Sequence, residues 1–248
     1  MIVNFANFEC SLDILTGSKV LSHPEFPLFT LEEEKDNMGV DKIGIKEHGL
    51  TPLLQIGCTA ELVEVFQAAR EYASILAKYQ ARPSVEPDLC TLSNQRNMVQ
   101  HRLLSLPPPG ESNNPDFFRQ CHPIYEACRV AGLIFGVGVI FPLPAHTAPF
   151  PALVRLLQAE LLQQHTFESR WCIPDVVRVL IWILTLGGIA ASGLPERSWF
   201  VAELVRVTLH ARLSTWQDLK QILEEMLWLD CACDIAGKQL WNEVQWIF

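Results

Sequence analysis

The sequence predicts an all-α protein, and three observations support this fold class. After residue 58, apolar residues recur at steps of three and four through most of the chain, which is the spacing of one helix face. No stretch alternates apolar and polar residues over the length of a strand, and no hairpin signal joins two such stretches. The composition is 49% hydrophobic and 19% charged, which suits a thick core. We therefore expect one multi-helix domain.

The chain divides into residues 1–58 and residues 59–248. Prolines and glycines interrupt the first part, which predicts an irregular N-terminal arm with one or two short helices. The helical pattern starts at Thr59, which is expected to cap a helix over residues 59–80. A second helix is expected from about residue 92 to residue 106.

A proline-rich loop at residues 105–116 precedes a third helix, expected over residues 115–141. The second half of this helix is apolar on all sides, so it should lie at the centre of the domain. Another break at residues 142–151 is followed by leucines at helical spacing, which predict a helix over residues 153–164.

Pro174 should lie in the first turn of a helix over residues 174–191, because its missing N–H is not needed there. Gly193 is expected to end this helix in a left-handed conformation. The next helix is expected over residues 196–212.

Two polar signals predict the starts of the last two helices. Ser214 and Gln217 have the spacing of a capping box, and apolar residues at helical steps follow them. Asp234 is expected to cap a final helix that ends near Gln245.

Two apolar runs, at residues 130–144 and 179–194, raise the question of a membrane. A spanning helix needs about 20 predominantly apolar residues, and both runs are shorter. We expect buried helices and no membrane contact. The net charge is −9, and no cluster of Lys or Arg offers the basic face that binds phosphates, so direct nucleic-acid binding is not expected.

The eight cysteines are irregularly spaced, and the first residues lack the features of a signal peptide. These two observations predict a reducing compartment, nucleus or cytoplasm, with free buried thiols such as Cys128 and Cys231. Cys231 and Cys233 supply at most two metal ligands, and on a helix they point about 200° apart. We expect no metal and no cofactor.

Two short motifs resemble catalytic or nucleotide-binding signatures in part. Ser192-Gly193 lacks the glycine at position 190 that a nucleophile elbow needs, and its setting is helical. Gly136-Val-Gly138 lacks the third glycine of a dinucleotide site. A helix end and close helix packing explain these motifs better, so we predict no catalytic residue.

Four polar residues among the strongest helices are the candidate site residues: Glu196, Arg197, His210 and Asp230. Buried charges persist when they are paired, so these residues are expected to act as structural ties between helices. Arg197 should reach a carboxylate such as Asp230 or a helix end. The alternative is that the four residues line a ligand pocket.

Several segments resemble the regulatory domain of fungal zinc-cluster transcription factors. The strongest lie in the C-terminal third: LIWILTLGGIAASGLPERSWFV (180–201), LSTWQDLKQILEEMLWLD (213–230) and CDIAGKQLWNEV (233–244). Weaker ones lie upstream: HGLTPLLQIGCTAELVEVF (48–66), RLLSLPPP (102–109) and PLPAHTAPFPALVRLL (142–157). Their order along the chain carries the resemblance.

The resemblance implies an all-α regulatory domain of a nuclear protein, often dimeric. The family's DNA-reading zinc cluster has no counterpart here, because no C-x2-C pair with a basic stretch occurs. We expect a regulatory or co-regulatory protein that acts through contacts with itself or a zinc-cluster regulator, with a small molecule as a further effector. The alternative is a stand-alone small-molecule-binding protein or metal-free enzyme that reuses the helical fold. A fragment, a natural stand-alone copy and a co-opted domain are all consistent with the sequence.

Overall fold

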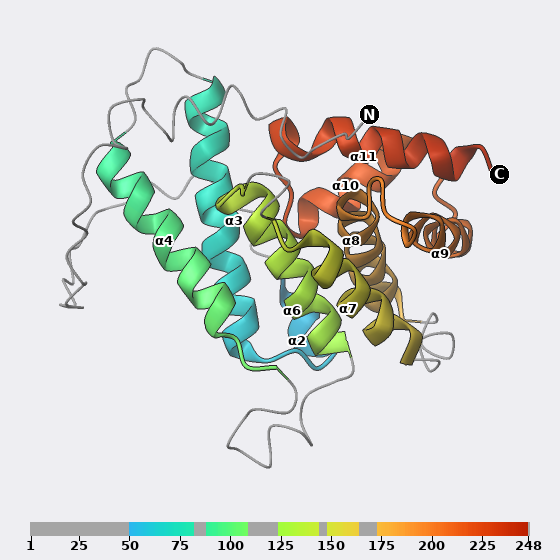
Figure 1. Cartoon of the computed structure of the whole chain (residues 1–248), viewed down its shortest axis with the longest axis horizontal. Coiled ribbons are helices and arrows are strands. Elements are labelled where there is room, and N and C mark those ends of the chain that lie inside the picture. Colours follow the sequence, from blue (N-terminus) through green and yellow to red (C-terminus); the bar gives the residue numbers. More distant parts are fainter. Residues whose placement is uncertain (1–49, 82–87, 109–123, 144–147, 164–172, 248) are drawn as a thin grey trace.

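The computed structural model confirms the all-α class. It describes residues 50–81, 88–108, 124–143, 148–163 and 173–247. Within those ranges every regular element is helical (Figure 1). The elements are α2 (Thr51–Gln55), α3 (Ala60–Ala81), α4 (Leu89–Ser105), α6 (Ile124–Phe135), the π-helix η1 (Gly136–Ile140), α7 (Phe150–Gln163), α8 (Pro174–Ala190), α9 (Arg197–His210), α10 (Trp216–Glu225) and α11 (Asp230–Gln245).

Helix α8 lies at the centre of the molecule, between the α6–α7 pair and the C-terminal helices α9 to α11 (Figure 1). Every residue from Val179 to Ala190 is buried. Trp182 is fully buried, stacks edge-on against Phe66 and donates from its indole N–H to the carbonyl of Leu227 at 3.0 Å. A helix surrounded on all sides needs apolar residues on all sides, which explains the charge-free run.

The two apolar runs are thus core helices, α6–η1 and α8. Among the helices that the structure describes, none combines the length and the apolar character needed to cross a bilayer.

Helices α3 and α4 pack side by side along one flank of the molecule (Figure 1). Thr59 caps α3 as predicted, because its hydroxyl accepts from the backbone N–H of Leu62 at 3.2 Å. Helix α4 begins at Leu89, before the predicted residue 92. Asp88 starts it by accepting from the N–H groups of Cys90 and Thr91, an N-cap that the sequence analysis overlooked.

The residues just before Thr59 belong to the same core. The short helix α2 packs against α3 and α8, and Leu53 within it is fully buried. The helical unit therefore begins no later than Leu50, whereas the sequence placed its start at residue 59. The rest of the predicted arm lies outside the described residues.

The third predicted helix is helical from Ile124 to Ile140, and the earlier residues of its predicted range are outside the description. Every residue of α6 is buried, as expected for a central helix. Its last turn widens into η1, where Phe141 donates to the carbonyl of Gly136 at 2.7 Å. A Cβ at Gly136 would lie 3.0 Å from Gln100 and Leu103 of α4, so close packing does explain this glycine.

The start and end of α8 follow the prediction. Pro174 is its first residue, and Gly193 has a φ of +76° just after its end. A Cβ at Gly187 would lie 2.4 Å from the ring of Phe200, so α9 can approach α8 only at a glycine.

Two predicted caps in the last helices are wrong. The capping box of α10 is formed by Thr215 and Asp218, one residue later than Ser214 and Gln217. The backbone of Thr215 is extended, and its hydroxyl accepts a hydrogen bond from the backbone N–H of Asp218. Asp234 does not cap the last helix, because α11 already begins at Asp230.

Candidate functional site

Arg197 joins the ends of two helices. Its guanidinium forms a two-point ion pair with Glu243 of α11, with N–O distances of 3.1 and 2.8 Å. The same group donates to the carbonyl of Gly188, near the C-terminal end of α8. The predicted contact with a helix end is confirmed, and the carboxylate partner is Glu243 instead of Asp230. Glu196 is the N-cap residue of α9, and its side chain makes no capping hydrogen bond.

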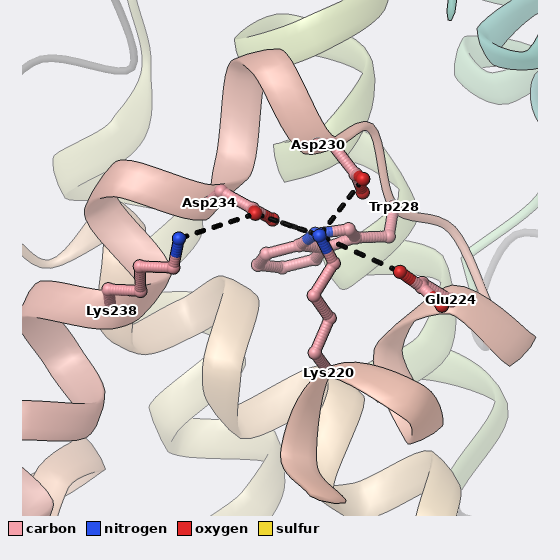
Figure 2. A network of polar contacts seen from close by, with 6 residues as sticks. All are labelled: Lys220, Glu224, Trp228, Asp230, Asp234 and Lys238. Atoms are coloured by element: carbon pink, nitrogen blue, oxygen red, sulfur yellow. Dashed lines mark hydrogen bonds and ion pairs between the residues drawn. The ribbon is translucent and has the colours of Figure 1, made fainter. Parts of the chain in front are cut away.

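Asp230 lies in a different cluster, which is centred on Lys220 of α10 (Figure 2). The ammonium group of Lys220 is 2.8 Å from Asp234, 2.9 Å from Asp230 and 3.6 Å from Glu224. Asp234 also accepts from the indole N–H of Trp228 at 2.9 Å. The cluster connects α10 to the first turns of α11.

The electrostatics of this cluster favour a structural role for Lys220. Burial lowers the pKa of Lys220, but its hydrogen bonds and charge interactions with Asp234 and Asp230 outweigh burial and raise the pKa above its ordinary value. A lysine that acts as a nucleophile or base needs a lowered pKa. Lys220 is therefore a charged tie between helices at neutral pH.

His210 lies at the C-terminal end of α9 and lines a solvent-open groove of about 710 Å³. Arg178 of α8 and Arg212, just after α9, line the same groove.

The structure does not bring the four sequence-predicted residues together. Arg197 contacts α11 at Glu243, whereas Asp230 is the first residue of that helix, roughly 20 Å away at 1.5 Å per residue. His210 belongs to the groove. Arg197 and Asp230 each form an ion pair between helices, and His210 lines the groove.

A buried ion pair on α6 escaped the sequence analysis. Arg129 and Glu126 form two contacts of 2.7 Å, and both residues are at most 9% exposed. Across the α6–α7 interface, burial raises the pKa of Glu160, and the charge of Glu126 raises it further. The only signal in the sequence was an i, i+3 pair of opposite charges inside an apolar helix.

The described thiols fall into two groups. Cys58 and Cys128 are buried with their sulfur atoms 3.9 Å apart, and burial raises the pKa of Cys128. Cys233 is also buried, which raises its pKa to about 12. Cys231 is exposed, contrary to the expectation, because residues two apart on α11 face opposite ways. Among the residues placed by the structure, no three His, Cys, Asp or Glu side chains are grouped to hold a metal.

Comparison of the chain with family models, with curated proteins and with solved structures found no match.

Proposed function

We propose that this chain is a non-catalytic regulatory domain that acts by binding another protein chain through the outward face of α11. The resemblance to zinc-cluster regulators supports such a role, and it suggests a second copy of the chain or a zinc-cluster regulator as the partner.

The observation that carries the proposal is that α11 and the residue that follows it expose two large apolar side chains. The inner face of this helix is buried, with Cys233, Leu240 and Val244 in the core. On the outer face, Ile235 is 52% exposed and Trp246 is 90% exposed. They are eleven residues apart, close to three full turns, so both point the same way.

The surroundings of Ile235 and Trp246 also suit a protein interface. Helix α11 runs along one edge of the molecule (Figure 1). Lys238, Gln239 and Asn242 are exposed between the two apolar residues, so polar groups separate the anchors. Tryptophan is enriched in protein interfaces and among the few residues that contribute most of the binding energy.

Helix α11 itself is held in place at both ends. Arg197 fixes the C-terminal part of α11 to α8 and α9, and Lys220 fixes its first turns to α10. A surface on a rigid element loses little conformational freedom when it binds. The polar residues of this region thus support a contact surface.

Native mass spectrometry of the chain purified from its own host tests the proposal. We expect a dimer or a complex with a zinc-cluster protein. Trp246→Ala should weaken that complex about tenfold or more, since interface tryptophans are frequent hot spots. Leu104→Ala on α4 is the matched control, because Leu104 is 64% exposed on a different helix. A chain that stays monomeric in the host extract, or a complex that both variants weaken equally, would refute the role of α11.

A further inference from the structure

The groove beside His210 is open to solvent and is lined by both charged and apolar side chains. It lies where the N-terminal half of α8, the link after α9 and the outer side of α10 meet. Its volume of about 710 Å³ is within the range of small-molecule sites, roughly 300–1,000 Å³. Pro174, Leu213 and Ile222 give it accessible apolar surface, and two arginines and a histidine stand beside that surface.

The acidic groups of the groove are already engaged. Glu225 forms an ion pair with Arg178 at 3.3 Å. Asp218 accepts from the backbone N–H groups of Thr215 and Ser214 at 2.9 and 3.3 Å, as part of the α10 capping box. The side chain of Arg212 has no hydrogen bond or ion pair with any residue in the described part of the chain. One guanidinium fork is thus available on a protein whose net charge is −9.

The backbone at Arg212 has a conformation that is unusual for a residue with a side chain. Arg212 donates to Leu209 and Leu213 donates to Thr208, which closes α9 in a Schellman motif. Arg212 occupies the left-handed position of this motif, with a φ of +56°. Glycine is favoured there, because a side chain is disfavoured in that conformation. The chain keeps a strained arginine at the edge of a groove, which is a pattern found at functional sites.

We propose that this groove binds a small monocarboxylic acid with an apolar body. The carboxylate is held by the fork of Arg212, with Arg178 and His210 beside it, and the apolar body lies on Pro174, Leu213 and Ile222. The proposal does not depend on the α11 contact, because neither Ile235 nor Trp246 lines the groove.

The charges favour a carboxylate over a phosphate. A carboxylate matches one guanidinium with two parallel hydrogen bonds. A phosphate monoester carries nearly two negative charges, which the carboxylates of Asp218 and Glu225 would repel. Arg212 alone would offset those charges, because Arg178 is already paired with Glu225. A single negative charge fits the remaining positive charge of the groove.

Isothermal titration calorimetry with octanoate and 4-phenylbutyrate tests this inference on the full chain. Each carboxylate should bind saturably at one site per chain. The matching neutral amides should have affinities at least about tenfold lower, because a charged hydrogen-bond pair is lost. Arg212→Gly should reduce the affinity for the carboxylates about tenfold without lowering the melting temperature, because glycine suits the left-handed position. Arg206→Gln is the control, since Arg206 lies on α9 outside the groove and should leave binding unchanged.

Three results would overturn the inference. They are no saturable binding of either carboxylate, equal binding of acid and amide, and unchanged affinity in Arg212→Gly. Tighter binding of 4-phenylbutyl phosphate than of 4-phenylbutyrate would overturn the assignment to carboxylates.

Discussion

Replacing Arg197 by alanine is the sharpest test of whether the polar residues among the C-terminal helices are structural ties. The substitution removes the ion pair with Glu243 and the hydrogen bond to the carbonyl of Gly188. The side chain of Arg197 is 16% exposed and that of Glu243 is 48% exposed, so the contact is only partly screened by water.

The expected loss of stability follows from three contributions. The charged hydrogen bond to Gly188 contributes about 1.5–3 kcal/mol. The half-exposed pair with Glu243 contributes up to about 1 kcal/mol. A positive charge at the first residue of α9 is unfavourable for the helix dipole, so its removal returns about 0.3–1 kcal/mol. Gly188 keeps a partner in the N–H of Ala191, which limits the loss. We expect Arg197→Ala to lower the free energy of unfolding by about 2 kcal/mol.

Urea denaturation followed by tryptophan fluorescence measures this loss. Glu243→Ala should cost less than about 1 kcal/mol, and the double variant should show a coupling of about 0.5–1 kcal/mol. Arg206→Ala is the control, because its pair with Glu203 joins residues of the same exposed helix face and should matter by less than about 0.5 kcal/mol. If Arg197→Ala unfolds like the parent chain and loses only partner or ligand binding, the structural interpretation of Arg197 is refuted.

Three further predictions concern the cluster, the core and the thiols. Lys220→Met should cost about 2 kcal/mol at pH 8, since it removes charged hydrogen bonds. The carboxylate partners of Lys220 outweigh burial and raise its folded-state pKa. The stability that Lys220 contributes should therefore be constant below about pH 10 and should fall as the pH rises toward and through that pKa. If the loss of stability in Lys220→Met is the same at pH 8 and pH 11, this expectation is wrong. Gly187→Ala should cost about 1–3 kcal/mol in urea denaturation, because the new Cβ would lie 2.4 Å from Phe200, and a neutral result would mean that the α8–α9 contact is loose. Iodoacetamide at pH 8 should label Cys90 in the folded chain and Cys128 only after unfolding, as peptide mapping would show; early labelling of Cys128 would contradict its burial.

The parts of the fold that the sequence predicts are those set by local rules. Thr59 and Pro174 have the positions expected for helix starts, and Gly193 has the conformation expected for a helix end. The charge-free run of α8 predicts a buried helix because each of its faces meets another helix. Such features depend on neighbours within a few residues, so one sequence contains them.

The errors arise where several local solutions compete. Ser214 and Thr215 are both good N-cap residues, and each has a polar residue three positions later. Thr215 is the cap because its partner at the third position is the charged Asp218, whose carboxylate accepts the N-cap N–H at 2.9 Å. Asp234 has the chemistry of a cap, but tertiary contacts with Lys220 and Trp228 use its carboxylate. Lys220 and Asp234 are 14 residues apart and lie on different helices, so the residue spacing within one helix does not predict their contact.

The sequence predicts the candidate site only in part. His210 and Arg197 appeared alike in the sequence, as polar residues between apolar helices, yet one lines a groove and the other closes a contact. What separates them is the neighbour that each meets from a distant segment, which is Glu243 for Arg197 and the open side of α10 for His210. Arg212 could not have been singled out, because its left-handed backbone follows from how α9 ends and not from its own residue type. A glycine at that position would have predicted only a helix end, whereas an arginine held there adds a guanidinium to the groove at a cost in backbone energy. Selection for stability alone would favour the glycine, so the arginine is the residue whose replacement should separate folding from binding.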